Sequence, residues 1–323
     1  MAAPNKRSKK KPLVKDQMRT LVISGGGSKG AFAGGVSEYL LRNAEKDYDL
    51  FVGSSTGSLL VPFLAIGDIE RIKRLYTSIS QSDIFTVCPF IVKRKNGEVK
   101  LRMNHLGIIM QFIKKQKTLG DSSALRTLIS KNFKLADFER IKALKKEVVV
   151  TVANLTTQMI EYKSSNECSY EEFCDWMWAS CNLSPLMSLF QKDGNDYADG
   201  GFGNLIPVQE AILKGATEID TIVLRQEKVV YNSPPLQNAI EVFARTSDFM
   251  LNQIANDDLI ISKLEAANRN VKISFYYINR ELTSHSFVFD NEEMSKWWQE
   301  GLELFSQREC KTHLLEGKTL LAK

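Results

Sequence analysis

The chain has 323 residues, enough for one large domain or two smaller ones with a substantial hydrophobic core. Charged residues make up 25% and the hydrophobic class 43%, which excludes a collagen, a coiled-coil rod and a wholly disordered protein. The net charge of +5 is uneven, since residues 1–19 carry +6 and the remainder carries −1. A nucleic-acid-binding domain is expected to have a basic folded body, so this distribution argues against nucleic acid as a partner.

The N-terminal segment, residues 1–18, is predicted to be a disordered basic tail that anionic lipid surfaces attract. It lacks the apolar stretch of a signal peptide, and no later run approaches the roughly 18–20 apolar residues of a membrane-spanning helix. The five cysteines are odd in number and lack the spacing of zinc ligands, which favours reduced structural thiols. We therefore expect a cytoplasmic protein with peripheral contact at a membrane surface.

Two strand–turn–helix units are predicted in the first part of the chain. Residues 20–24 form an apolar, β-branched run that ends in three glycines, and a helical pattern follows over residues 29–43. Residues 49–52 form a second buried strand, and an apolar helix over residues 58–66 follows it after a turn. Two such units in succession predict a parallel sheet covered by helices.

The elements further along the chain are less regular. The pattern between residues 81 and 146 predicts helices laid over one end of the sheet, and residues 103–113 are a candidate lid or acyl-chain wall. From residue 227 the chain is predicted to be mainly helical. An apolar stripe there either packs on the core, which we favour, or lies in a membrane interface; it consists of Met294, Trp297, Trp298, Leu302 and Phe305. The other predicted elements are helices over 68–80, 170–181 and 207–214 and strands over 147–153, 158–163, 219–224 and 272–278.

A candidate nucleophile turn lies between the second strand and its helix. Gly53-Ser54-Ser55-Thr56-Gly57 fits the pattern G-x-S-x-G, in which glycines at both ends relieve the crowding around a strained central residue. The turn places the hydroxyl of Ser55 at a helix N-terminus, where free N–H groups and the helix dipole favour a developing oxyanion. Ser54 occupies an x position and is expected to point elsewhere. The alternative is a small-residue turn that only allows close packing.

A glycine loop follows the first strand and fits the pattern G-x-G-x-x-G. Its key residues are Gly25, Gly26, Gly27, Lys29 and Gly30. A dinucleotide-binding loop requires an acidic residue near the end of the second strand, but that strand ends in Gly53. Because the loop follows a strand that would lie beside the strand carrying Ser55, its backbone N–H groups are candidates for an oxyanion hole.

A serine nucleophile needs a base, and histidine is scarce in this chain. The three histidines are His105, His285 and His313, and none lies in a turn framed by glycines. Asp199 does, because Gly200 and Gly201 follow it. Partial desolvation beside the nucleophile would raise the pKa of this carboxyl group and make it a better base. Taken alone, an Asp-Gly pair is more typical of a plain turn than of a catalytic site.

In their order and strand context, the three motifs resemble those of the patatin-like phospholipases, over about residues 19–226. The resemblance implies a three-layer α/β/α fold with a mainly parallel central sheet and a catalytic dyad of Ser55 and Asp199. It assigns the glycine loop to the oxyanion hole, with Lys29 where the family often has arginine. Residues 179–185, Asn204 and Pro207 also resemble the family's pattern. The chain is thus divided into the tail 1–18, a patatin-like domain 19–226 and a mainly helical C-terminal region 227–323 of unknown role.

The resemblance implies hydrolysis of fatty-acyl carboxyl esters, most naturally in phospholipids, through an acyl-enzyme and without a metal or organic cofactor. Two alternatives remain open. One is a Ser-His-Asp esterase that uses His285 or His313. The other is a non-enzymatic nucleotide- or phosphate-binding module on a Rossmann-like sheet. No motif in residues 227–323 indicates a regulator or an oligomer contact.

Overall fold

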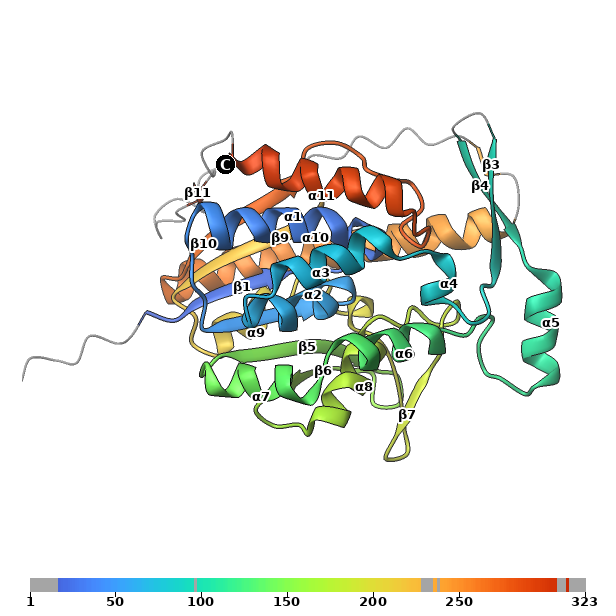
Figure 1. The fold of residues 1–323 in the computed structure, drawn as a ribbon, viewed down its shortest axis with the longest axis horizontal. Helices are drawn as coiled ribbons and strands as arrows, with labels where there is room; N and C mark the ends of the chain where they lie inside the picture. The colour runs from blue at the N-terminus through green and yellow to red at the C-terminus, as the bar shows by residue number, and fades with distance from the viewer. Residues whose placement is uncertain (1–16, 96–97, 228–234, 237–238, 307–311, 314–323) are drawn as a thin grey trace, which may run out of the picture.

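A mixed nine-stranded sheet forms the centre of the molecule (Figure 1). The structure, a computed structural model, describes residues 17–95, 98–227, 235–236, 239–306 and 312–313. The strand order is β11-β10-β9-β1-β2-β5-β8-β7, and β6 also pairs with β5. The five strands from β10 to β5 run parallel, whereas β6, β7, β8 and β11 pair antiparallel with their neighbours. The strands are β1 (Arg19–Ile23), β2 (Leu50–Ser54), β5 (Glu147–Asn154), β6 (Met159–Ser164), β7 (Phe190–Lys192), β8 (Asn195–Asp199), β9 (Glu218–Gln226), β10 (Lys272–Ile278) and β11 (Thr312–His313).

Helices cover both faces of this sheet, because alternate strand residues point to opposite sides. Leu21 and Ile23 of β1 belong to a core shared with α1, α2, α3, α6, α8 and α11, whereas Val22 belongs to a second core shared with α9 and α10. The helices of the body are α1 (Gly30–Glu38), α2 (Thr56–Ala65), α3 (Ile69–Ser78), α4 (Gln81–Ile84), α6 (Ser123–Asn132), α7 (Leu135–Ala143), α8 (Tyr170–Ser180), α9 (Val208–Leu213), α10 (Ala239–Arg269) and α11 (Asn291–Ser306). Short helical turns lie at η1 (Gly27–Lys29), η2 (Tyr39–Asn43) and η3 (Gly200–Phe202). The predicted α/β fold with a mostly parallel sheet is confirmed.

The described elements beyond residue 226 belong to the same sheet and the same cores. Strand β10 lies parallel to β9, and α11 packs on α1. The contact is close because α1 presents two glycines: a Cβ atom at Gly34 would overlap the indole ring of Trp298. The indole Nε1 donates a 2.6 Å hydrogen bond to the Glu38 carboxylate. Met294, Trp297 and Trp298 are buried, which confirms that the apolar stripe of this helix packs on the core.

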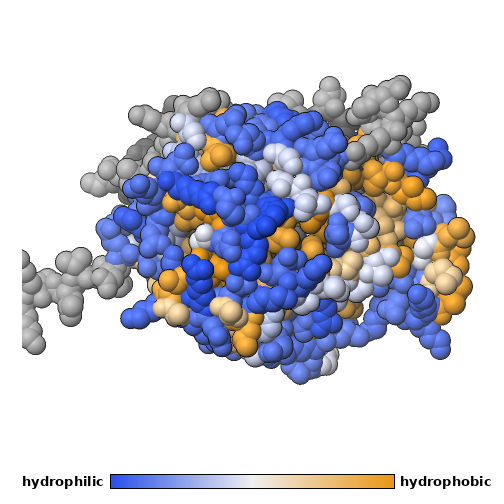
Figure 2. Space-filling view, in the orientation of Figure 1, coloured by the Kyte–Doolittle hydropathy of each residue, from blue (hydrophilic) through white to orange (hydrophobic). Residues whose placement is uncertain are grey.

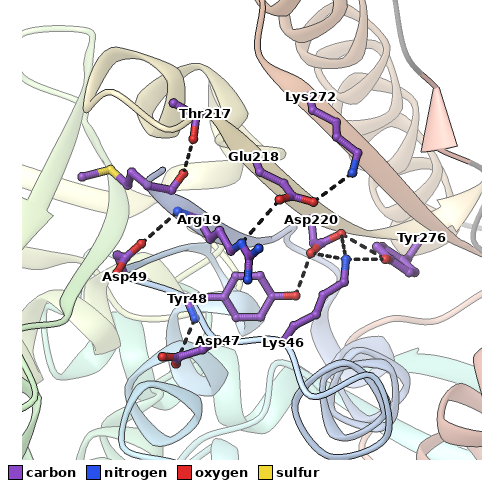
Figure 3. Close-up of polar contacts among 11 residues, drawn as sticks. Arg19, Lys46, Asp47, Tyr48, Asp49, Thr217, Glu218, Asp220, Lys272 and Tyr276 are labelled. Carbon is purple, nitrogen blue, oxygen red and sulfur yellow. Dashed lines mark hydrogen bonds and ion pairs between the residues drawn. The ribbon is translucent and has the colours of Figure 1, made fainter. Parts of the chain in front are cut away.

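A polar network at the amino end of the sheet joins β10 to the rest (Figure 3). The buried carboxylate of Asp220 on β9 accepts hydrogen bonds from Tyr276 on β10 at 3.0 Å and from Tyr48 at 2.8 Å. The amine of Lys46 lies 2.7 Å from the same carboxylate. Burial next to this negative charge holds the pKa of Tyr48 well above its usual value. Each oxygen of Asp220 is therefore satisfied by donors, and the network has a structural role.

The expectation of helices alone between residues 81 and 146 is wrong. A hairpin of β3 (Phe90–Lys95) and β4 (Glu98–Met103) leads into helix α5 (His105–Ile113), and both project from one end of the molecule (Figure 1). The sequence does contain a hairpin signal. Asn96-Gly97 is a dipeptide that favours a two-residue hairpin turn, and apolar and polar residues alternate after it. Among the residues that the structure describes, no helix has both the length and the apolar character needed to cross a bilayer.

Candidate active site

The G-x-S-x-G motif forms a sharp turn between β2 and α2. Ser55 has φ +52° and ψ −124°, a combination that L-residues rarely adopt and that stores strain at functional sites. A Cβ atom at Gly53 would lie 2.5 Å from the Gly57 carbonyl carbon, and one at Gly57 would overlap the Ile23 carbonyl oxygen. Glycine is therefore required at both ends of the motif. The buried hydroxyl of Ser54 points away from Ser55 and donates to the Asn204 carbonyl at 3.0 Å.

Asp199 lies at the end of β8, directly opposite the nucleophile turn. Its Oδ2 accepts a 2.6 Å hydrogen bond from Ser55 Oγ, and its Oδ1 accepts one of 2.8 Å from the N–H of Gly201. A Cβ atom at Gly200 would overlap the Thr151 carbonyl oxygen, so the turn requires this glycine. Asp199 is 4% exposed, and burial raises its pKa to about 7, although the bonds from Ser55 and Gly201 oppose the rise. A carboxylate with this pKa can accept a proton near neutral pH.

A third segment, at the end of α8, holds the two residues in place. The hydroxyl of Ser180 accepts a hydrogen bond from the N–H of Ser55 at 3.0 Å, and the thiol of Cys181 donates to the Ser55 carbonyl at 3.1 Å. The Asn182 carbonyl accepts from the N–H of Asp199 at 2.9 Å. Motif reasoning from single residues missed these contacts, because Ser180 and Cys181 lie more than a hundred positions from Ser55. Only the family resemblance pointed to this segment.

The glycine loop lies against Ser55, and its N–H groups divide into two sets. The N–H of Gly25 donates to the Leu205 carbonyl at 3.0 Å, that of Lys29 to the Gly26 carbonyl at 3.2 Å, and that of Gly30 back into η1. Within the described part of the chain, the N–H groups of Gly26 and Gly27 have no protein acceptor. A Cβ atom at Gly25 would lie 3.1 Å from Ser55 Cβ. The loop thus presents two unused donors beside the nucleophile.

A cavity of about 1680 Å³ contains Ser55, Asp199 and the glycine loop in its wall. This volume exceeds the range of roughly 300–1,000 Å³ typical of small-molecule sites. Helices α2, α3, α6 and α8 supply an apolar wall, which includes Leu59, Phe63, Ile72, Leu75, Leu128 and Met177. A polar part of the wall includes Lys29, Arg225, Asp248, Asn252, Glu281 and His285. The cavity therefore suits an amphiphilic molecule.

Lys29 belongs to the polar wall of this cavity rather than to the set of unused donors. Lys29 is half-buried; burial lowers the pKa of its amine, and the nearby carboxylates of Asp248 and Glu281 oppose that effect. Burial also raises the pKa of Asp248. In the described residues, no cluster of three or more histidine, cysteine, aspartate or glutamate side chains is arranged to hold a metal ion.

The three histidines lie in different places. His285 lines the cavity beside the glycine loop, and His105 is exposed at the start of α5. His313 pairs with Ile273 at the outer edge of the sheet, four strands from β2, which corresponds to roughly 19 Å across the sheet. Among the described residues, the hydrogen-bond partner of the Ser55 hydroxyl is Asp199 and not a histidine.

Comparison with known proteins gives one family match. The model of the patatin-like phospholipases matches residues 21–212. Among solved structures, VipD from Legionella pneumophila is 16% identical with a TM-score of 0.45, over 90% of this chain and 67% of that one. The type III effector protein ExoU is 12% identical with a TM-score of 0.33, over 92% of this chain and 55% of that one. No curated protein matches the sequence.

Proposed function

The chain belongs to the patatin-like phospholipase family, and we propose that it hydrolyses fatty-acyl esters of phospholipids with Ser55 as nucleophile and Asp199 as base. Membership of the family implies a lipid acyl hydrolase. The observation that supports the finer assignment is the 2.6 Å hydrogen bond from Ser55 Oγ to the buried carboxylate of Asp199. All residues of this mechanism lie within the proposed catalytic unit 19–226, to which β10 and α11 add an edge and a cover.

In the first half of the reaction, Ser55 Oγ attacks the ester carbonyl while its proton passes to Asp199 Oδ2. The N–H groups of Gly26 and Gly27 are the candidate donors to the negative oxygen of the tetrahedral intermediate. Loss of one such donor typically costs about 2.7–4 kcal/mol of transition-state stabilisation. When the intermediate collapses, Asp199 returns the proton to the leaving alcohol oxygen, and the acyl group remains on Ser55.

In the second half of the reaction, Asp199 and the glycine loop promote the attack of a water molecule on the acyl-enzyme. Asp199 takes a proton from a water molecule that attacks the acyl carbonyl, and the glycine loop again receives the negative oxygen. Collapse releases the fatty acid and returns the proton to Ser55 Oγ. The pKa of about 7 at Asp199 serves both halves, because the group must give up its proton as readily as it takes it.

The shape of the cavity supports a lipid ester as the substrate. An acyl chain fits the apolar wall of α2, α3, α6 and α8, and a polar head group fits the wall that carries Lys29 and Arg225. Ser55 lines the same cavity as both groups of residues, and the ester bond of a phospholipid would lie beside it. The mixed charges of the polar wall do not select one head group.

The test is release of fatty acids from mixed phospholipids, measured by mass spectrometry. Wild type is expected to release fatty acids, and Ser55→Ala and Asp199→Asn are expected to lose at least a thousandfold in rate. Ser54→Ala is the matched control, because it removes the neighbouring hydroxyl and leaves the dyad intact. Equal losses in Ser54→Ala and Ser55→Ala would contradict the assignment.

The histidine alternative has its own test. His285 lies in the cavity wall, so a Ser-His-Asp esterase would lose its base in His285→Ala. We expect this variant to keep the rate on a soluble ester within a fewfold of wild type. A complete loss in a folded His285→Ala protein would replace the dyad with a histidine base. The nucleotide-binding alternative is disfavoured because the glycine loop packs against Ser55.

A further inference from the structure

Helix α5 turns its apolar side chains outward. Leu106 is 79% exposed, Ile113 is 68% exposed and Phe112 is 60% exposed, and Ile109 and Met110 are also exposed. The buried side of the helix carries the polar Gln111 together with Ile108. On a water-facing helix the outer positions are polar, so this pattern is reversed. Figure 2 shows the resulting hydrophobic patch on the projecting end of the molecule.

Basic residues precede and follow this apolar helix in the chain. Lys114, Lys115 and Lys117 follow it directly and are exposed, as are Lys93 and Arg102 on the hairpin that precedes it. Residues 90–117 contain eight lysines and arginines and a single acid, Glu98. The net charge of +5 therefore combines +6 in residues 1–19, +7 in residues 90–117 and −8 in the rest of the chain. The near-neutral charge of the body conceals a basic segment.

The patch follows directly in the chain on residues that line the catalytic cavity. Leu101 and Arg102 of β4 line the cavity and lie next to α5 in the chain. Phe249 of α10 also lines it and is itself 63% exposed. Ser55 and the glycine loop follow the carboxyl ends of β2 and β1, which point toward the end where the hairpin and α5 project (Figure 1). A surface that contacts α5 would thus lie at the same end of the molecule as the catalytic residues.

We propose that α5 and its basic flanks form a docking surface for anionic phospholipid bilayers, with Leu106, Phe112 and Ile113 entering the interface between head groups and acyl chains. The proposal rests on the proposed function, because a bilayer is where the substrate of a phospholipase lies. The exposed apolar side chains of α5 match the apolar interior of a bilayer, and the basic residues that flank the helix match its negatively charged head groups. The five described basic residues before and after α5 are all exposed, and this charge favours an anionic bilayer over a neutral protein surface.

The test uses the catalytically inactive Ser55→Ala chain and vesicles of phosphatidylcholine with about 30% phosphatidylserine. We expect Leu106→Asp/Phe112→Asp/Ile113→Asp to reduce the vesicle-bound fraction at least tenfold in sedimentation. The matched control is Leu135→Asp/Leu144→Asp/Leu213→Asp, which replaces leucines that are 45–57% exposed at the ends of α7 and α9, away from α5. It is expected to bind like its parent. Equal binding by both triple variants would overturn the proposal.

A second pair of measurements separates this surface from the chemistry. In the active chain, the α5 triple variant is expected to hydrolyse a soluble short-chain ester at the wild-type rate and vesicle phospholipid at least tenfold more slowly. A parallel loss on the soluble ester would place α5 in the catalytic unit and overturn the docking role. If wild type hydrolysed no ester, the proposed function would fail, while the vesicle-binding result would still decide the docking surface.

Discussion

The Asp199→Asn variant is expected to be more stable than wild type at about pH 8, although it is inactive. Burial raises the pKa of Asp199 from 3.8 to about 7, so the folded protein binds this proton more tightly than the unfolded chain does. The contribution of Asp199 to the free energy of unfolding therefore falls as the pH rises from about 4 to about 7. The asparagine side chain can keep the bond from the N–H of Gly201 and can donate to Ser55 Oγ, but it carries no charge.

The magnitude follows from the two pKa values. At about pH 8 the ionised carboxylate lowers the free energy of unfolding by roughly 4 kcal/mol, and at about pH 5 by less than half of that. The stability difference between Asp199→Asn and wild type should thus shrink by roughly 2.5 kcal/mol between these two pH values. Asp258, whose pKa is also raised to about 7 by burial, is present in both proteins and cancels.

Urea unfolding of both proteins at about pH 5 and pH 8 measures this difference. The reasoning predicts a larger difference at the higher pH, in favour of the variant. A difference that is independent of pH, or a wild type that is the more stable protein at about pH 8, would show that the Asp199 carboxylate is not desolvated. The proposed tuning of the base would then be refuted.

Three further outcomes are expected. The kcat/KM for a soluble ester should rise with pH and level off above about pH 7, because Asp199 must be ionised to take the proton of Ser55; a flat profile from pH 5 to 8 would contradict this. Trp298→Ala should lower the free energy of unfolding by about 3–5 kcal/mol, because it leaves a cavity against α1 and removes the hydrogen bond to Glu38. Urea titration measures this loss, and a loss below about 1 kcal/mol would show that α11 is not part of the core. Deletion of residues 1–16 should weaken binding to anionic vesicles at low salt and leave the hydrolysis of a soluble ester unchanged. Unchanged vesicle binding would show that the tail does not contribute to membrane attachment.

The parts of the site that were predictable from sequence are those with local steric causes. Glycine at positions 53 and 57 is required because backbone atoms crowd a strained turn, and such crowding is visible in a five-residue pattern. The same holds for Gly200 after Asp199, where the Thr151 carbonyl leaves no room for a side chain. Strand β2, which precedes the nucleophile turn, was also recognisable, because a buried parallel strand reads as a continuous apolar run.

The parts that were missed depend on contacts between distant segments. Nothing local marks Ser180 as the acceptor for the N–H of Ser55, or shows that Leu205 occupies the N–H of Gly25. Helix α5 has a clear helical period, but the period does not reveal which environment the apolar face meets. We expected a helix laid over one end of the sheet, as a lid or a wall for an acyl chain. The direction of a helix face is set by tertiary structure, and here the chain turns that face outward.

The central claim is that Ser55 is the nucleophile, and reaction with a fluorophosphonate ester tests it most directly. The wild-type protein should be labelled on Ser55, as identified by mass spectrometry of its peptides, and labelling should persist in Ser54→Ala and vanish in Ser55→Ala. Labelling of a residue other than Ser55, or a folded Ser55→Ala protein that still reacts, would contradict the account.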